Sequence, residues 1–275
     1  FGPSMAAGPH GRRGHGWSWT CTCAAAACVA AAADPEYRVF TTHSTVEYWS
    51  RRYAAGTSFT VNSFAGEHSY PEPPPLYRAR TTYLKTVMQR FPDVRSVIDF
   101  GCGDGIQAFM TLEAIPQINA YVGLDIVALT IYRIKTATDM AGALRSIDPQ
   151  REIELGFYHY SGYTVPRPIR RSFGTFDIAL SLSVLMHILE EDLFLAYMRM
   201  LFASSRYFVV IQSDNIQRGR HRHMHWRRFT DWVKANATDW ALYDWKPVSG
   251  FCPESLCGDH GDDAMWMYVR REHLA

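Results

Sequence analysis

One segment, Val94 to Gly105 (VRSVIDFGCGDG), restricts the fold of this chain more than any other. It begins with a short run rich in β-branched and apolar residues, which predicts a buried strand over 94–100. The strand leads directly into a turn with glycines at alternate positions, and a helical stretch over 106–114 follows. Glycine adopts positive φ and lets a ligand approach the backbone, and a helix N-terminus offers free N–H groups. The segment therefore predicts a strand, a ligand-binding turn and a helix.

Short strands alternate with helical segments along the rest of the chain. Strands that alternate with helices indicate a parallel sheet with helices on both faces, so the predicted class is α/β and doubly wound. Two strands in succession at the end predict a terminal antiparallel hairpin. The predicted strands cover 121–124, 153–158, 176–182, 206–212, 240–245 and 265–270, and the predicted helices cover 43–53, 76–91, 106–114, 128–144, 190–202 and 229–236.

Two acidic residues stand at positions that suit different parts of one ligand. Asp99 lies two residues before the first glycine of the turn. A carboxylate there disfavours a pyrophosphate but suits an ammonium group, and the glycine spacing differs from the G-x-G-x-x-G of dinucleotide turns. Asp125 ends the second strand, where doubly wound sheets place a carboxylate on ribose hydroxyls. The turn is therefore predicted to hold an amino acid moiety, and Asp125 a ribose.

These motifs together resemble a known family. VIDFGCGDG followed by YVGLDIV is similar to motifs one and two of the class I S-adenosylmethionine-dependent methyltransferases. A bacterial-type subgroup also carries a YW-x-x-RY-x-x-G start, a histidine after the fourth strand and a late RRF-x-x-W element, which fall here at 48–56, 179–187 and 225–232. The resemblance covers roughly residues 46–270. It implies a Rossmann-like, mostly parallel sheet ending in an antiparallel hairpin, with S-adenosyl-L-methionine as the cofactor.

The resemblance also assigns residues to the cofactor and the acceptor. Trp49 and Tyr53 would cover the cofactor cleft as a lid and contact the substrate, although core packing is the alternative for two aromatic side chains. Arg227 and Arg228 would hold an anionic or sugar-bearing substrate, and a solvated basic face is their alternative. The cofactor residues would be Asp99, Gly101, Cys102, Gly103, Asp104, Gly105, Asp125, Ile126, Ser181 and Leu182.

His187 follows the fourth strand directly and is the candidate general base. Imidazole titrates near neutral pH, so it can take a proton from a hydroxyl acceptor. A histidine that orients the following helix is the alternative. Glu190 and Glu191 stand where a helix begins and are expected to compensate the helix dipole.

The sequence also departs from the subgroup. A proline-rich loop over 57–75 replaces a Gly/Ser-rich stretch, and Ser183 stands where an acidic residue is common. The departures fall outside the cofactor motifs. The resemblance therefore indicates that the cofactor is bound, but it does not identify the substrate.

The predicted function is transfer of a methyl group to oxygen or nitrogen of a small molecule or glycan. An RNA or protein methyltransferase, or a non-catalytic subunit with this fold, are the alternatives. The 28 basic and 27 acidic residues give a net charge of +1, without the basic excess of a general nucleic-acid coat. The Asn-Pro-Pro-Tyr or Asp-Pro-Pro-Tyr of base-nitrogen methylating enzymes is absent after the fourth strand.

No metal site is predicted. His221, His223 and His225 would share one face of a strand and could bind a metal there, but Gly219 and the surrounding arginines favour a loop. Cys252 and Cys257 have no second pair of ligands beside them, and they would form a disulfide only in a secreted protein.

The first 40 residues are expected to lie outside the folded domain. FGPS before Met5 resembles a remnant of protease cleavage, and an acid-free, Ala-rich stretch extends to Ala33. This leader is either a targeting peptide or a disordered tail, so the expected location is cytoplasmic or organellar. One methyltransferase domain is expected over 41–275, with a helix and a loop capping it over 41–92. No run of ~18 strongly apolar residues predicts a membrane span.

Overall fold

The computed structural model describes residues 44–54, 75–137, 140–167, 169, 174–216, 219–221, 224–253 and 263–274. The leader predicted over 1–40 lies outside these ranges, as does the proline-rich loop apart from Pro75. Every helix in the described ranges is too short or too polar to cross a lipid bilayer.

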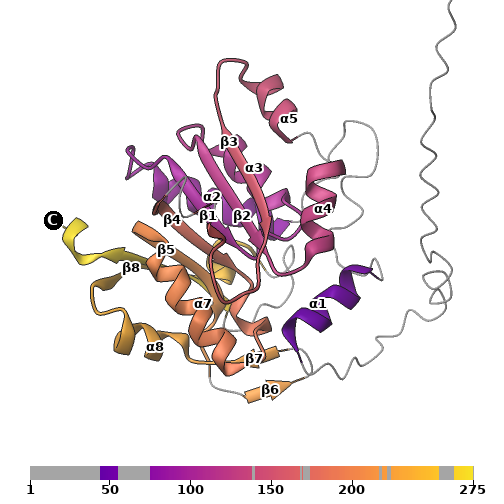
Figure 1. Ribbon diagram of the computed structural model, residues 1–275. Coiled ribbons are helices and arrows are strands. Elements are labelled where there is room, and N and C mark those ends of the chain that lie inside the picture. The colour runs from indigo at the N-terminus through magenta and orange to yellow at the C-terminus, as the bar shows by residue number, and fades with distance from the viewer. Residues whose placement is uncertain are drawn as a thin grey trace, which may run out of the picture. The chain divides into compact units, whose positions relative to one another are not determined.

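A seven-stranded sheet forms the centre of the domain (Figure 1). Its strands are β1 (Ser96–Phe100), β2 (Ala120–Asp125), β3 (Glu154–His159), β4 (Phe176–Leu182), β5 (Ser205–Asp214), β8 (Trp240–Pro247) and β9 (Asp263–Arg270). They follow the order β3-β2-β1-β4-β5-β9-β8. Strands β1 to β5 pair in parallel, whereas β9 runs antiparallel between β5 and β8. This arrangement confirms the predicted α/β class and the antiparallel end of the sheet.

The helices agree with the predicted ones to within three residues at each end, except at one place. The single helix predicted over 128–144 is two helices, α4 and α5, and residues 138–139 between them lie outside the described ranges. In the last turn of α4 the Thr136 hydroxyl donates to the Tyr132 carbonyl at 2.8 Å, a bond that competes with the helical ladder. The helices are α1 (Thr45–Ala54), α2 (Pro75–Met88), α3 (Ile106–Ala114), α4 (Ala128–Ala137), α5 (Met140–Ile147), α7 (Glu191–Ala203) and α8 (Phe229–Asn236).

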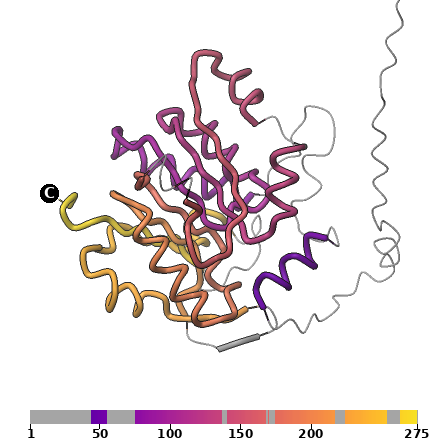
Figure 2. The backbone as a smooth tube through the Cα atoms, viewed as in Figure 1, coloured from indigo at the N-terminus to yellow at the C-terminus, as the bar shows by residue number. Residues whose placement is uncertain are grey.

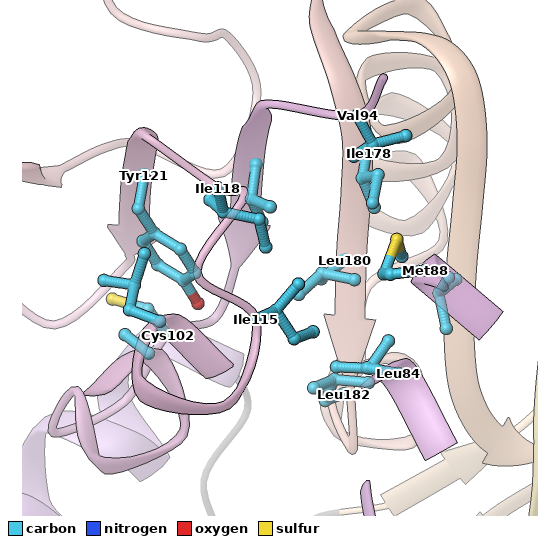
Figure 3. Packing of buried hydrophobic residues seen from close by; sticks show 14 of the residues in the cluster. Leu84, Met88, Val94, Cys102, Ile115, Ile118, Tyr121, Ile178, Leu180 and Leu182 are labelled. Carbon is cyan, nitrogen blue, oxygen red and sulfur yellow. The ribbon is translucent and has the colours of Figure 1, made fainter. Parts of the chain in front are cut away.

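Helices cover both faces of the sheet, so both faces are buried. Successive strand residues point to opposite faces, and Val97 and Ile98 accordingly belong to different apolar clusters. One cluster joins the sheet to α2, α3, α4 and α5, and the other joins it to α7 and α8. Figure 3 shows Leu84 of α2 close to Leu182 of β4 in the first cluster. Burial on both faces explains why the strands appear as continuous apolar runs in the sequence.

The carboxyl ends of the parallel strands meet at one edge of the sheet. In open α/β folds, ligands bind outside this edge. The helix α1, drawn in indigo, lies beside α4 (Figure 2). A short 3₁₀ turn, η2 (Leu185–His187), follows β4 and leads to α7.

Candidate functional site

A cavity of about 630 Å³ lies at the carboxyl edge of the sheet. It is bounded by the ends of β1, β2 and β4, by α1 and by the start of α2. Most of the site residues predicted from sequence line it, from segments that are far apart in the chain. These lining residues are Trp49, Tyr53, Asp99, Gly101, Cys102, Gly103, Asp104, Asp125, Ile126, Leu182 and His187.

The glycine turn after β1 forms the floor of this cavity. Gly101, Gly103 and Gly105 have φ values of +83°, +56° and +84°, which side-chain-bearing residues rarely adopt. A Cβ on Gly101 would also lie 2.5 Å from a methyl group of Val184. The backbone N–H of Gly101 donates to the Leu124 carbonyl at 2.7 Å, which ties the turn to β2. The turn therefore keeps its backbone close to the cavity.

Asp99 presents an unsatisfied oxygen in the lining of the cavity. Its side chain is buried, and Oδ2 accepts a hydrogen bond from the Tyr121 hydroxyl at 2.7 Å. Oδ1 is buried and accepts no hydrogen bond from any of the described residues. Burial raises the pKa of Asp99 to about 6, an effect that Tyr121 and Arg80 partly offset. Buried polar atoms are nearly always hydrogen-bonded, so Oδ1 is suited to a ligand that donates hydrogen bonds.

Asp125 is held in the cavity by the backbone. Its Oδ1 accepts from the N–H of Val127 at 2.8 Å, and its Oδ2 accepts from the N–H of Gly103 at 3.1 Å. Burial raises the pKa of Asp125 to about 7, although these two hydrogen bonds favour the ionised form. Each carboxylate oxygen can accept more than one hydrogen bond, so Asp125 keeps acceptor capacity for two ligand hydroxyls. The neighbouring Asp104 instead accepts from the N–H of Ile106, at the start of α3.

Arg80 of α2 is a lining residue that the sequence did not reveal. Its side chain is 4% exposed, and its Nη2 donates to the Ser183 hydroxyl at 2.5 Å. Its Nε donates to the Gln212 Oε1, and the Gln212 amide nitrogen donates in turn to Asp263, which fixes the orientation of that amide. No carboxylate of the described residues forms an ion pair with this guanidinium. Burial lowers the pKa of Arg80.

A signal for Arg80 does exist in the sequence. Leu76, Arg80 and Leu84 follow one another at four-residue spacing, so a charged residue interrupts the apolar stripe of a predicted helix. Buried arginines are rare unless paired, and one that faces a cavity suits an anionic ligand. Ser183, its partner, has a φ of +58°, a strained conformation for serine that neighbouring contacts must maintain.

The aromatic residues of α1 line the cavity together with His187. The ring centres of Trp49 and Tyr53 lie 5.8 Å apart, and those of Trp49 and His187 lie 4.8 Å apart with the two rings nearly perpendicular. A Cβ added to Gly103 would lie 3.6 Å from the Tyr53 hydroxyl, so this residue stands over the glycine turn. Burial raises the pKa of Tyr53 well above its usual value, and Asp125 adds to the effect. The α1 residues thus form a wall between the turn and His187.

Four of the predicted site residues do not contribute to the described lining of the cavity. Gly105 lies at the start of α3, and Ser181 is fully buried in β4, where its hydroxyl accepts from Tyr197 at 2.8 Å. Arg227 directs its guanidinium to the Ile188 carbonyl at 2.7 Å and to Glu191 at 2.8 Å. Arg228 is exposed at the N-terminus of α8. The geometry therefore gives neither arginine a place beside a substrate in this cavity.

The loop predicted around the alternating histidines is wrong. Strands β6 (Gly219–His221) and β7 (Met224–Trp226) pair antiparallel, with Arg220 opposite His225 and His221 opposite Met224. This short hairpin pairs backbone groups that a loop would leave to water. His223 lies outside the described ranges, within which no group of three or more His, Cys, Asp or Glu side chains could hold a metal ion.

The two described cysteines differ in their chemistry. Cys102 is a free, buried thiol in the glycine turn, and burial raises its pKa well above the usual value. Cys252 is disulfide-bonded, and Cys257 lies outside the described ranges. A free thiol with a raised pKa is a weak nucleophile, so Cys102 is suited to packing rather than to covalent chemistry.

Comparison with known proteins identifies the fold. No protein-family model and no curated protein matches the sequence. The methyltransferase domain of bacterial CtHen1-C is 18% identical, with a TM-score of 0.51 over 71% of this chain and 98% of that one. The small RNA methyltransferase HEN1 is 17% identical, with a TM-score of 0.55 over 75% of this chain and 26% of that one.

A third similar structure contains ligands. The 1,6-didemethyltoxoflavin-N1-methyltransferase of Burkholderia thailandensis, with bound 1,6-didemethyltoxoflavin and S-adenosylhomocysteine, is 16% identical. Its TM-score is 0.53, over 82% of this chain and 86% of that one. The seven-stranded sheet and these similarities together establish that the chain has the Rossmann-like fold of the class I methyltransferases.

Proposed function

We propose that the protein is an S-adenosylmethionine-dependent methyltransferase. The observation that carries this proposal is that Asp99, with its unsatisfied Oδ1, and Arg80, with its guanidinium, line the same cavity. A zwitterionic α-amino acid group has an ammonium for the first and a carboxylate for the second, and charge-assisted hydrogen bonds of this kind are strong. Asp125, on the neighbouring strand, offers two oxygens to the hydroxyls of a ribose.

The residues present therefore fit S-adenosylmethionine, which carries an amino acid group and a ribose. When bound, this cofactor supplies a methyl group on a positively charged sulfur. The chain's own contribution is to align an acceptor with that group, because alignment removes much of the barrier to a displacement. His187 takes the proton from the acceptor's hydroxyl or amine, and Trp49 and Tyr53 exclude water from the cavity.

The acceptor is proposed to be a small molecule or a glycan. The near-neutral charge of the chain and the aromatic wall that Trp49 and Tyr53 give the cavity support a compact substrate over a polyanion. RNA is the second candidate, because the similar structures include a small RNA methyltransferase. The deciding experiment incubates the protein with methyl-labelled cofactor and cell extract, and then measures label in small-molecule, RNA and protein fractions. Label confined to the small-molecule or glycan fraction supports the proposal, and label in RNA favours the second candidate.

Cofactor binding is the first expected result. Titration calorimetry should detect micromolar binding of S-adenosylmethionine and S-adenosylhomocysteine, because Asp99 and Arg80 match their amino acid group and Asp125 matches their ribose. NAD is the control, since its pyrophosphate would lie against Asp99. Heat with NAD but none with either adenosyl compound would rule out the proposal.

The affinity for S-adenosylhomocysteine should also depend on pH. Asp99, with a pKa of about 6, and Asp125, with a pKa of about 7, must be ionised to accept hydrogen bonds at full strength. We expect affinity to rise from pH 5 to pH 8, and to weaken by up to about tenfold for each pH unit below a titrating pKa. Calorimetry across this range measures the effect, and Asp99→Asn should remove the part near pH 6. A flat profile would contradict the assignment of both carboxylates.

The stability of the ligand-free protein should change in the opposite direction. Both pKa values are raised above the value of 3.8 that an aspartate has before burial, so the folded state binds protons more tightly than the unfolded state. The stabilising contribution of these protons is complete below about pH 4 and is lost as pH rises through 6 and 7. Thermal melts of the ligand-free protein should show this contribution as a smaller fall in melting temperature from pH 5 to pH 8 for Asp99→Asn than for the wild type.

A further inference from the structure

The helix α1 is attached to the rest of the domain at its first residue. The Thr45 N–H donates to Glu190 Oε1 at 2.9 Å, and the Thr45 hydroxyl lies 2.5 Å from Glu190 Oε2. The same hydroxyl lies 3.2 Å from the His187 carbonyl and accepts from the Leu189 N–H at 2.8 Å. Thr45 is 2% exposed. One side chain thus joins α1 to the segment between η2 and α7.

The chemistry of these bonds makes Glu190 the principal partner. A hydroxyl has one proton to donate, and the charged Glu190 oxygen is a stronger and nearer acceptor than the His187 carbonyl. The first N–H groups of a helix have no acceptor within the helix, and a carboxylate is stabilising at this positive end. Glu190 therefore caps α1 from 145 positions away. Its position in the sequence had suggested a role at the start of α7, but its side chain makes no capping hydrogen bond to that helix.

This attachment matters because α1 has little stability of its own. Helices of 10 residues are marginal in water, so α1 depends on its caps and on the burial of Tyr48 and Tyr53. Ser44 supplies a second cap by accepting from the Glu47 N–H at 3.1 Å. At the other end, Arg133 donates to the Tyr53 carbonyl at 3.5 Å, the outer limit of a hydrogen bond. Among the hydrogen bonds of the described residues, those at the N-terminal end of α1 are therefore the shorter ones.

The helix carries two lining residues across the cavity. Trp49, one turn beyond Thr45, meets His187 edge-on at 4.8 Å, and Tyr53 stands over the glycine turn. A shift of α1 would therefore change the cover of the cavity and the surroundings of His187 together.

We infer that Thr45 and Glu190 are positioning residues that hold α1 as a lid over the bound cofactor and fix that lid against His187. This inference rests on the proposed function for the identity of the cofactor. The Thr45–Glu190 contact holds this lid at its N-terminal end.

Hydrogen exchange of the full, ligand-free chain tests the attachment without any cofactor. Thr45→Val keeps the shape of the side chain but removes the hydroxyl, and Thr45→Ser keeps the hydroxyl. In Thr45→Val the amides of residues 48–54 should exchange about tenfold faster than in the wild type, while those of β1 and β4 keep their protection. Thr45→Ser should restore slow exchange. Unchanged exchange in Thr45→Val, or equal acceleration in both variants, would overturn the inference.

A matched pair of glutamates makes the test specific. Glu190→Gln should accelerate exchange in α1, because it removes the charge that caps the helix. Glu191→Gln should leave α1 unchanged, because Glu191 binds Arg227 instead. Equal effects of the two variants on α1 would show that Glu190 has no particular role there.

The dissociation rate of S-adenosylhomocysteine tests the lid itself. Stopped-flow measurements should show about tenfold faster release from Thr45→Val than from the wild type and no change in Thr45→Ser. Normal binding with an unchanged release rate in Thr45→Val would overturn the lid. Failure of the wild type to bind any adenosyl ligand would instead refute the proposed function. The hydrogen-exchange results would in that case still test the Thr45–Glu190 attachment, because they need no cofactor.

Discussion

Replacement of His187 by alanine is expected to lower turnover about 10²- to 10⁴-fold, the usual cost of losing a general base. His187 lines the cavity at the carboxyl end of β4, and its ring lies nearly perpendicular to that of Trp49. Affinity for S-adenosylhomocysteine should hardly change, because Asp99, Arg80 and Asp125 are untouched. Single-turnover rates and calorimetry on the same variant, with an acceptor found by the labelling experiment, separate the two quantities.

The alternative role of His187 leads to a different result. A histidine that only orients the following helix would, when replaced, lower the melting temperature, the cofactor affinity and the turnover together. His225→Ala is the matched control, since the His225 ring contacts the Leu189 carbonyl and does not line the described cavity. Comparable losses of turnover in both variants would contradict a special role for His187.

Asp99→Asn should weaken binding of S-adenosylhomocysteine about 10- to 100-fold, because the variant loses one charge-assisted hydrogen bond to the ligand in a buried site. The amide keeps the size of the side chain and an oxygen that can accept from Tyr121. Folding should not suffer, since the raised pKa of Asp99 shows that the buried charge costs stability in the absence of a ligand. Calorimetry and thermal melts measure both effects.

A second ligand makes this test selective. 5′-Deoxy-5′-methylthioadenosine has the ribose and adenine but no amino acid group, so Asp99→Asn should leave its affinity unchanged. Asp125→Ala should weaken both ligands, because both carry the ribose hydroxyls. Equal losses for the two ligands in Asp99→Asn would show that Asp99 does not recognise the amino acid group.

Local chemistry explains why much of the fold could be predicted. Apolar runs and turn residues mark β1, the glycine turn and α3, because strand and helix periods act over a few residues. The positions of Asp99 and Asp125 at strand ends follow from the same patterns, since parallel strands bring these ends to one edge. The pattern could not locate the break between α4 and α5 or the pairing of β6 with β7. The local preference of the chain is weak at the break and in the hairpin, so tertiary contacts decide the structure at both places.

The sequence by itself determined the α/β class, the strand–turn–helix unit and the two carboxylates that face the cavity. Only the tertiary structure decided that β9 lies between β5 and β8, that Arg80 reaches Gln212 across 132 positions, and that Glu190 caps α1 across 145. These contacts leave almost no pattern in the chain, because a hydrogen bond needs one donor and one acceptor and imposes no period on the residues around them. Their partners meet only after the sheet has formed and brought its edge, α1 and α2 together.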